Sequence, residues 1–304
     1  MFKYQRILVP LDGSELAERA LTPAITIAQA MDASLVLFRA VPLMAELTGS
    51  DQTDIEKAGG TETDYLRSVL GQAVNVGVEG CTQLSIWQPA AESIIACAKE
   101  SEADLIVMSS HGRSGRSRWV FGSVAEKVLR RTPCHVMVIR AQAETDPFTR
   151  QRILVPLDGS PLAEEALPPA VSLAAATDAE LLLLRVIESG KAAIARVDRK
   201  VLYGNIEIRG REEAEPYLQD VRDSLAEHYS SVKTAVVAGP VAETIVDYAE
   251  KHQAGLIVMS SHGRSGLSRW LYGSIAEKVL HGAGCATLVI PMKNRVNTKQ
   301  AISK

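Results

Sequence analysis

Apolar and polar positions along the chain form short apolar runs separated by segments of helical periodicity, and this order occurs twice. Apolar runs of this length predict strands buried on both faces. In the first half, the predicted strands are Arg6–Leu11, Ser34–Val41, Thr82–Trp87, Asp104–Met108 and His135–Arg140. In the second half, they are the repeated ILVPL run after residue 152, then Glu180–Ile187, Lys233–Ala238, Gly255–Met259 and Ala286–Pro291.

The segments between these strands predict helices. Ser14 is a typical N-cap before a helix whose one face carries Leu16, Ala20, Leu21, Ala24, Ile27 and Ala28. Ser160 followed by Pro161 predicts the same start in the second half, and Pro23 and Pro169 should kink or shorten these helices. Further helices are predicted at Ala90–Ser101, Ser123–Arg131, Val241–His252 and Ser274–His281.

Two polar segments, at about 43–60 and 189–208, are predicted to be mobile loops that lead into a second helix. Strands that alternate with helices in this way predict an α/β fold, in which helices cover both faces of a parallel sheet. Ligands of such sheets bind at the carboxyl ends of the strands, where the strand order reverses.

Two sequence motifs are repeated almost unchanged. QRILVPLDGS occupies residues 5–14 and 151–160, and VMSSHGRSGRSRWVFGSVAEKVL at 107–129 returns at 258–280 with four differences. Repeats this far apart indicate two whole domains. We therefore expect one domain at 1–142, a linker at 143–150 that contains Pro147, and a second domain at 151–295.

Bulk composition excludes several partners. The net charge of −3 gives no general attraction to nucleic acid or anionic lipid, so neither is expected as a partner. No apolar run approaches the ~18 residues of a membrane-spanning helix, and no signal peptide is recognisable. The four cysteines, far apart in the chain, are interpreted as small buried apolar residues in a reducing compartment, which favours a cytoplasmic location.

The second repeated motif has the chemistry of a phosphate site. Ser123 and Glu126 form a capping box, which predicts that a helix begins here. The amides of Gly122, Ser123 and Val124 would then point out of the helix N-terminus towards an anion. Gly112 and Gly122 let the backbone approach a phosphate closely.

Other groups of the motif add to this site. Ser109, next to Met108 at the end of the fourth strand, offers a hydroxyl, and Arg113 offers a positive charge. The second half repeats the set as Met259, Ser260, Gly263, Arg264, Gly273, Ser274 and Ile275. In the alternative interpretation, the glycines only shape a strand–helix connection and the serine only caps. The loop lacks the GxxxxGK[ST] pattern and is not a Walker A loop.

Asp12 and Asp158 end the first strand of each copy, and two roles are open for them. Each can bind a ribose hydroxyl or a metal held by phosphates, or each can be an Asp-Gly turn residue ahead of a helix cap. His111 and His262 have no second ligand at metal spacing and are interpreted as loop hydrogen-bonding residues.

These residues resemble the universal stress protein family, in its ATP-binding subgroup, over nearly all of both halves. The family motif is Gly, two residues, Gly, nine residues and Gly-Ser/Thr; Gly112, Gly263 and the two Gly-Ser pairs match it, whereas Ser109 and Ser260 replace its first glycine. The resemblance implies a five-stranded parallel sheet of order 3-2-1-4-5 in each half. It also implies ATP across strands one and four, with Pro10, Leu11, Asp12 and Ala40, or Pro156, Leu157, Asp158 and Val186, around the adenosine.

The expected function is therefore a stress-response protein with two adenine-nucleotide sites for ATP and Mg²⁺, a regulator rather than a fast enzyme. Two alternatives stay open: a slow ATP hydrolase, and an adaptor whose sites are vestigial. Because family members dimerise through the fifth strand, the two fifth strands are expected to pair inside the chain. Such pairing covers an apolar sheet edge that otherwise invites association, and further oligomers are compatible with it.

Overall fold

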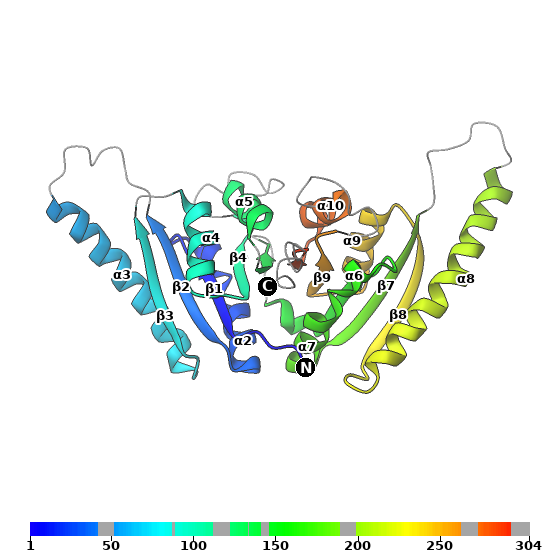
Figure 1. Ribbon diagram of the computed structural model, residues 1–304, viewed down its shortest axis with the longest axis horizontal. Coiled ribbons are helices and arrows are strands. Elements are labelled where there is room, and N and C mark those ends of the chain that lie inside the picture. The colour runs from blue at the N-terminus through cyan, green and yellow to red at the C-terminus, as the bar shows by residue number, and fades with distance from the viewer. Residues whose placement is uncertain are drawn as a thin grey trace, which may run out of the picture.

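The computed structural model describes residues 1–41, 52–86, 89–111, 122–132, 134–140, 146–188, 199–262 and 273–292. For residues 52–59, 86 and 199–207 it describes only the backbone. Strands and helices alternate along both halves, which confirms the α/β fold class (Figure 1).

Every predicted strand is present, with its ends within two residues of the predicted ones. The first half contains β1 (Arg6–Pro10), β2 (Ser34–Val41), β3 (Gly80–Ile86), β4 (Leu105–Ser109) and β5 (His135–Ile139). The second half contains β6 (Arg152–Pro156), β7 (Glu180–Glu188), β8 (Val232–Gly239), β9 (Leu256–Ser260) and β10 (Ala286–Ile290).

The described strands form one ten-stranded sheet in the order β3-β2-β1-β4-β5-β10-β9-β6-β7-β8. Each half has the predicted order 3-2-1-4-5, with parallel neighbours throughout. Only β5 and β10 pair antiparallel, with Met137 opposite Leu288. The predicted pairing of the two fifth strands is thus confirmed, and the fifth strand of each half has a neighbour on both sides.

The helices follow the strands as expected, with one correction near the start of each half. The helices are α1 (Glu15–Glu18), α2 (Leu21–Met31), α3 (Gln52–Asn75), α4 (Ala90–Glu100), α5 (Ser123–Arg131), α6 (Pro161–Glu164), α7 (Leu167–Thr177), α8 (Arg199–Leu225), α9 (Val241–Lys251) and α10 (Ser274–Gly282). The single first helix predicted after Ser14 is two helices, α1 and α2. A break before Leu21 puts Pro23 in the first turn of α2, where a residue without an N–H group leaves no hydrogen bond unmade.

The predicted loops at 43–60 and 189–208 are wrong over part of their length. Helix α3 begins at Gln52 and α8 begins at Arg199, so both helices reach into these segments. A helix on the outside of a sheet needs only one apolar stripe, so much of its sequence can be polar. In α3 this stripe is supplied by Leu66, Val69 and Ala73. Residues 42–51 and 189–198 lie outside the described part of the chain.

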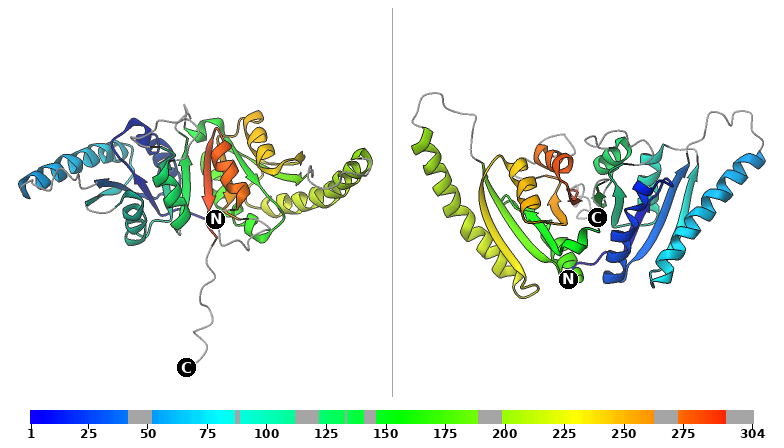
Figure 2. Two further views of the ribbon diagram at one scale, coloured as in Figure 1. Left: turned by 90° about the horizontal axis from the view of Figure 1, so that it is seen from above. Right: turned by 180° about the vertical axis from the view of Figure 1, so that it is seen from behind.

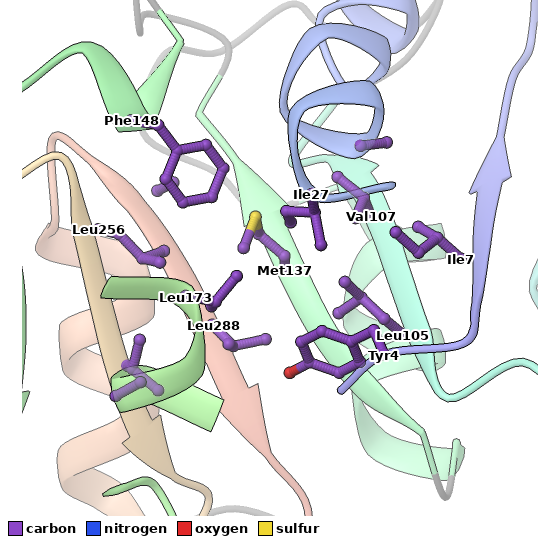
Figure 3. Close-up of a cluster of buried hydrophobic side chains, with 14 of the residues drawn as sticks. Tyr4, Ile7, Ile27, Leu105, Val107, Met137, Phe148, Leu173, Leu256 and Leu288 are labelled. Atoms are coloured by element: carbon purple, nitrogen blue, oxygen red, sulfur yellow. The ribbon is translucent and has the colours of Figure 1, made fainter. Parts of the chain in front are cut away.

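One hydrophobic core runs through both halves on the face of the sheet covered by α2, α3, α7 and α8 (Figure 2). Figure 3 shows Met137 of β5 and Leu288 of β10 in this core, with Phe148 of the predicted linker, Leu173 of the second half and Ile27 of the first around them. The opposite face holds two further cores. One lies mainly beneath α4 and α5 and includes Leu280 and Val289 of the second half, and the other lies beneath α9 and α10. The halves therefore share a core as well as a sheet.

Three of the four cysteines are buried as predicted, but Cys81 is exposed, because β3 is an edge strand of the sheet. Burial raises the pKa of Cys97 to about 12 and that of Cys285 to about 11, so both stay thiols at neutral pH. Within the described residues, no helix is long and apolar enough to span a membrane.

Candidate functional site

The turn at the end of β1 holds Asp12 in the same geometry as its counterpart in the second half. Asp12 Oδ1 accepts hydrogen bonds from the backbone N–H (2.9 Å) and the hydroxyl (2.6 Å) of Ser14. Ser14 Oγ in turn caps α1 by accepting from Ala17 N–H at 3.2 Å. Gly13 between them has φ +80°, a left-handed conformation that favours glycine.

The second half repeats this turn after β6. Asp158 Oδ1 accepts from the N–H (2.9 Å) and the hydroxyl (2.5 Å) of Ser160, and Ser160 Oγ caps α6. The turn role of Asp12 and Asp158 is therefore realised. Their contact with a ribose or a metal stays a prediction. It is compatible with the turn role, because a carboxylate accepts about four hydrogen bonds.

Helix α5 starts next to the end of β4, but the predicted capping box is not formed there. Gly122, with extended backbone, is the N-cap, and Ser123 is the first residue inside the helix. The capping-box assignment of Ser123 was wrong by one position, since a residue inside the helix cannot accept from its own first turn as a cap does. Gly273 and Ser274 stand in the same relation in α10.

The backbone N–H of Gly122 is also engaged, which corrects a second expectation. It donates to Ser110 O at 2.9 Å, and the N–H of Gly273 donates to Ser261 O at 2.8 Å. The first-turn amides that remain for an anion therefore begin at Ser123 and Ser274, one position later than predicted. A helix has no backbone partners for the N–H groups of its first turn, and here the cap residue has no side chain to supply one.

A cavity of about 480 Å³ opens at the carboxyl ends of β6, β7 and β9 and reaches the first turn of α10. Its lining includes nine residues predicted from the sequence: Pro156, Leu157, Asp158, Val186, Met259, Ser260, Gly273, Ser274 and Ile275. The structure thus brings the predicted residues of three strand ends and one helix start together around a single space.

The first half places the counterparts of these residues at the same strand ends and helix start. Pro10 ends β1, Ala40 lies near the end of β2, Met108 and Ser109 end β4, and Gly122 precedes Ser123 and Val124 at the start of α5. Leu11 and Asp12 follow Pro10 directly, and Leu11 N–H donates to Phe38 O of β2 at 2.7 Å.

The middle of the glycine loop lies outside the described part of the chain. This concerns Gly112, Arg113, Gly263 and Arg264, which therefore stay predictions. The histidines at the loop starts are described and make the predicted loop hydrogen bonds. Ser110 Oγ and His111 Nδ1 are 3.0 Å apart, and Ser261 Oγ and His262 Nδ1 are 3.1 Å apart.

An arginine near the end of the second strand of each half was not predicted from the sequence as a site residue. Arg39 on β2 is 6% exposed and forms an ion pair with Glu62 of α3 at 2.7 Å. Its guanidinium carbon lies 4.8 Å from the centre of the Tyr65 ring. Arg185 on β7 is partly exposed, lines the cavity and donates to Leu157 O at 3.3 Å. A charged residue inside an otherwise apolar strand, in both copies, was the available signal.

A tyrosine from the long outer helix completes this region in both halves. Tyr65 donates to Glu18 Oε1 at 2.7 Å, and Tyr217 donates to Glu164 Oε1 at 2.9 Å. Burial, and then the hydrogen bond to the glutamate, raises the pKa of each tyrosine well above its usual value. Both hydroxyls therefore stay protonated donors and tie α3 to α1, and α8 to α6.

The cavity is bounded by acidic groups as well. Glu188 at the end of β7 and Glu213 on α8 line it together with Asp158. Among the residues that the structure describes, no three His, Cys, Asp or Glu side chains are grouped to hold a metal ion by themselves. The phosphate-held Mg²⁺ of the sequence analysis stays a prediction.

The two helix-start glycines differ in the space around them. A Cβ on Gly122 would lie 2.9 Å from Ser110 O, whereas a Cβ on Gly273 would lie 3.4 Å from Ser261 O. The first distance requires the backbone to shift and the second is an ordinary contact. Gly122 thus has a structural role in the strand–helix connection, which the alternative interpretation of the motif had left open.

Comparison with known proteins gives matches over both halves. The model of the universal stress protein family matches residues 3–140 and 149–291. A universal stress protein of Methanocaldococcus jannaschii is 33% identical over 140 residues, which are 46% of this chain and 81% of that protein. One of Mycobacterium tuberculosis is 32% identical over 192 residues, 62% of each chain.

Solved structures match the whole arrangement. A universal stress protein from Archaeoglobus fulgidus aligns with a TM-score of 0.70 over 96% of this chain and 100% of its own, at 19% identity. A Pseudomonas aeruginosa protein of unknown function aligns with a TM-score of 0.71 over 95% of this chain and 93% of its own, at 21% identity. At these identities the likeness concerns the fold alone.

Proposed function

Because the chain belongs to the universal stress protein family, we propose that it is a stress-response protein that binds two adenine nucleotides, one in each half, and acts as a regulator. The observation that carries this proposal is the cavity of about 480 Å³ in the second half. A pocket of this size at the point where the strand order reverses is where open α/β sheets bind small ligands.

The two ends of the cavity differ in chemistry in the way that a nucleotide requires. At one end, the first turn of α10 offers the Ser274 hydroxyl and the backbone amides that follow Gly273. Amides at a helix N-terminus bind phosphate well. At the other end, Leu157, Val186 and Ile187 offer apolar contacts for a base. ATP would therefore lie with its phosphates at α10 and its adenosine over β6 and β7.

Asp158 stands between these ends and fits a ribose hydroxyl or a Mg²⁺ ion carried by the phosphates. Its Oδ1 is held in place by Ser160, so the carboxylate has a fixed orientation in the lining of the cavity. Asp12 has the same orientation through Ser14. We assign both residues this role, and assign Gly263, Arg264, Gly112 and Arg113 to the phosphates from their sequence positions.

A charge placed on the helix start tests the proposal. Gly273→Asp puts a carboxylate where the phosphate would bind, while the fold should hold, because aspartate is a good N-cap and a Cβ at this position has room. Gly284→Asp is the matched control: a Cβ there meets nothing within 4 Å, and the added charge is the same.

Calorimetric titration with ATP and Mg²⁺ reads out the result. We expect Gly273→Asp to remove one of two binding events and Gly284→Asp to retain both. ATP turnover by the unmodified protein should stay close to the uncatalysed rate, as befits a regulator. Equal binding by the two variants would contradict the placement of the phosphates, and rapid turnover would contradict the regulatory role.

A further inference from the structure

Two carboxylates line the cavity of the second half at the end away from α10. Glu188 is the last residue of β7, and Glu213 belongs to α8. Both residues line the cavity and both are exposed, which places them at its mouth. In Figure 1, β7 and α8 lie on the outer side of this half and α10 lies near the centre of the molecule. The mouth is therefore acidic at the end where the base of a nucleotide is placed.

Close packing of α8 against β7 positions the second of these carboxylates. Gly210 lies so near Ile187 that a Cβ on the glycine would come within 2.7 Å of Ile187 Cγ2. Residues three apart share one face of a helix, so Glu213 stands on the same face as Gly210. Ile187, Gly210 and Glu213 all line the cavity. Glu213 therefore stands close to the end of β7, where Glu188 follows Ile187.

The first half has neither carboxylate at the equivalent positions. The first and second strands of the two halves pair in the same register, so Glu188 corresponds to Pro42. The tyrosines of α3 and α8 bond to equivalent glutamates of α1 and α6, so the outer helices are in register as well, and Glu213 corresponds to Thr61. Since this framework is common to both halves, the fold itself does not require the two glutamates.

The chemistry of a carboxylate indicates which part of a ligand it faces. An ionised carboxylate only accepts hydrogen bonds, and it repels the like charge of a triphosphate. The exocyclic amino group of adenine is a hydrogen-bond donor. A carboxylate accepts about four hydrogen bonds, so a glutamate of this cavity can bond to a neighbour such as Arg185 and to a ligand at once.

We propose that Glu188 and Glu213 are specificity-determining residues of the second site, which accept hydrogen bonds from the amino group of adenine. The inference deepens the proposed function and rests on it. It agrees with a nucleotide whose phosphates lie at α10 and whose base lies over the end of β7. The first site, with Pro42 and Thr61 at these positions, should discriminate less strongly between nucleotides with and without this amino group.

A nucleotide without the amino group isolates this contact. Purine ribonucleoside triphosphate is ATP without the amino group, and its ribose and phosphates are unchanged. The double variant Glu188→Ala/Glu213→Ala removes both carboxylates from the mouth of the cavity. Glu212→Ala/Glu227→Ala is the matched control, because these two glutamates are also exposed, do not line the cavity and carry the same charge. Substitutions of exposed residues of this kind should leave the fold intact.

Titration calorimetry of the full chain with each nucleotide plus Mg²⁺ gives the ratio of the two dissociation constants at each site. At the second site of the unmodified protein, we expect ATP to bind more tightly than purine ribonucleoside triphosphate by on the order of tenfold, the lower end for a hydrogen bond to a charged group. Glu188→Ala/Glu213→Ala should reduce this ratio to within about twofold, and the control should leave it unchanged. The Gly273→Asp protein, in which only the first site binds, should show a smaller ratio than the second site.

The opposing outcomes are distinct. Equal strengthening of both nucleotides by Glu188→Ala/Glu213→Ala would overturn the proposal, because the carboxylates would then act only on the phosphates. A ratio that the control changes as much, or a first site that discriminates as strongly as the second, would also overturn it. An unmodified protein that binds neither nucleotide would reject the proposed function itself, whereas equal binding of the two nucleotides at the second site would reject only the role of the glutamates.

Discussion

The two halves of the chain have the same strand order and the same turn and helix start at their candidate sites, but they differ where the outer helix meets the sheet. Asp12 and Asp158 are held by identical hydrogen bonds, whereas Glu62 of α3 is replaced by Ala214 in α8. After duplication, the strand-end turns therefore stayed alike while a neighbouring helix changed. A site can diverge through residues beside it without loss of its framework.

The junction between the halves is asymmetric as well. Arg140, directly after β5, donates to Leu280 O at 3.2 Å and to His281 O at 3.1 Å, the carbonyls at the end of α10. The equivalent residue after β10 is Pro291, which has no donor to return the contact. The first half thus caps a helix of the second, and Pro291 gives no equivalent cap in return.

Separation of the halves should give the largest effect. A fragment of residues 1–142 exposes the edge of β5 and the face of Met137 that packs on the second half. An unpaired apolar edge promotes association, so we expect the fragment to dimerise through β5. Analytical ultracentrifugation checks this. A well-folded monomer at high micromolar concentration would show that the edge does not need a partner.

Loss of packing at the β5–β10 junction should have a smaller effect than separation of the halves, but it should still lower the stability of the protein substantially. Leu288 is fully buried opposite Met137, so Leu288→Ala should lower the free energy of unfolding by about 2–5 kcal/mol. Ile208, which is 56% exposed, provides the control. Ile208→Ala should change the free energy of unfolding by less than about 0.5 kcal/mol. Chemical denaturation measures both; similar values would mean that the junction contributes little to stability.

Removal of the Arg140 side chain, which caps the end of α10, should have an intermediate effect on stability. Arg140→Ala leaves the carbonyl groups of Leu280 and His281 without this donor, at a cost of about 1–3 kcal/mol. Arg67→Ala, which removes an exposed ion pair with Asp64, should cost at most about 1 kcal/mol. Thermal unfolding by calorimetry compares the two. If the Arg140 variant unfolds at the temperature of the control, the cap does not hold the halves together.

The smallest difference in stability is expected between alanine substitutions of the two glycines at the helix starts, Gly122 and Gly273. Gly122→Ala brings a Cβ to 2.9 Å from Ser110 O and should destabilise the protein by about 1–3 kcal/mol. Gly273→Ala, with 3.4 Å to Ser261 O, should be closer to the cost of losing an N-cap glycine alone, about 1 kcal/mol or less. The order of the two melting temperatures, measured without nucleotide, checks this; the reverse order would mean that the backbone at Ser110 gives way easily.

Much of the fold was predictable because its determinants are local. The apolar runs of β1, β4 and β5 are buried for most of their length in the sheet, so composition alone identifies them. The duplication, together with the family's strand order, predicted the pairing of β5 with β10. The break before Leu21 was only partly foreseen, since a proline fits equally well in a kink and in a first helical turn.

The candidate site was predictable in its framework and not in its neighbours. The strand ends and the helix start came from the repeated motifs and the family resemblance, and nine of the predicted residues meet around the cavity of the second half. Arg39 was missed because its partner Glu62 is distant in sequence and is brought close only by the packing of α3 against the sheet. The cap shifted from Ser123 to Gly122 because serine followed by glutamate does not by itself specify the first helical residue.

Native mass spectrometry with increasing ATP and Mg²⁺ tests the central claim most directly, because it counts the nucleotides on each chain. We expect two nucleotides per intact chain at saturation and one on the Gly273→Asp protein. A folded chain that carries no nucleotide at saturating ATP would contradict the account.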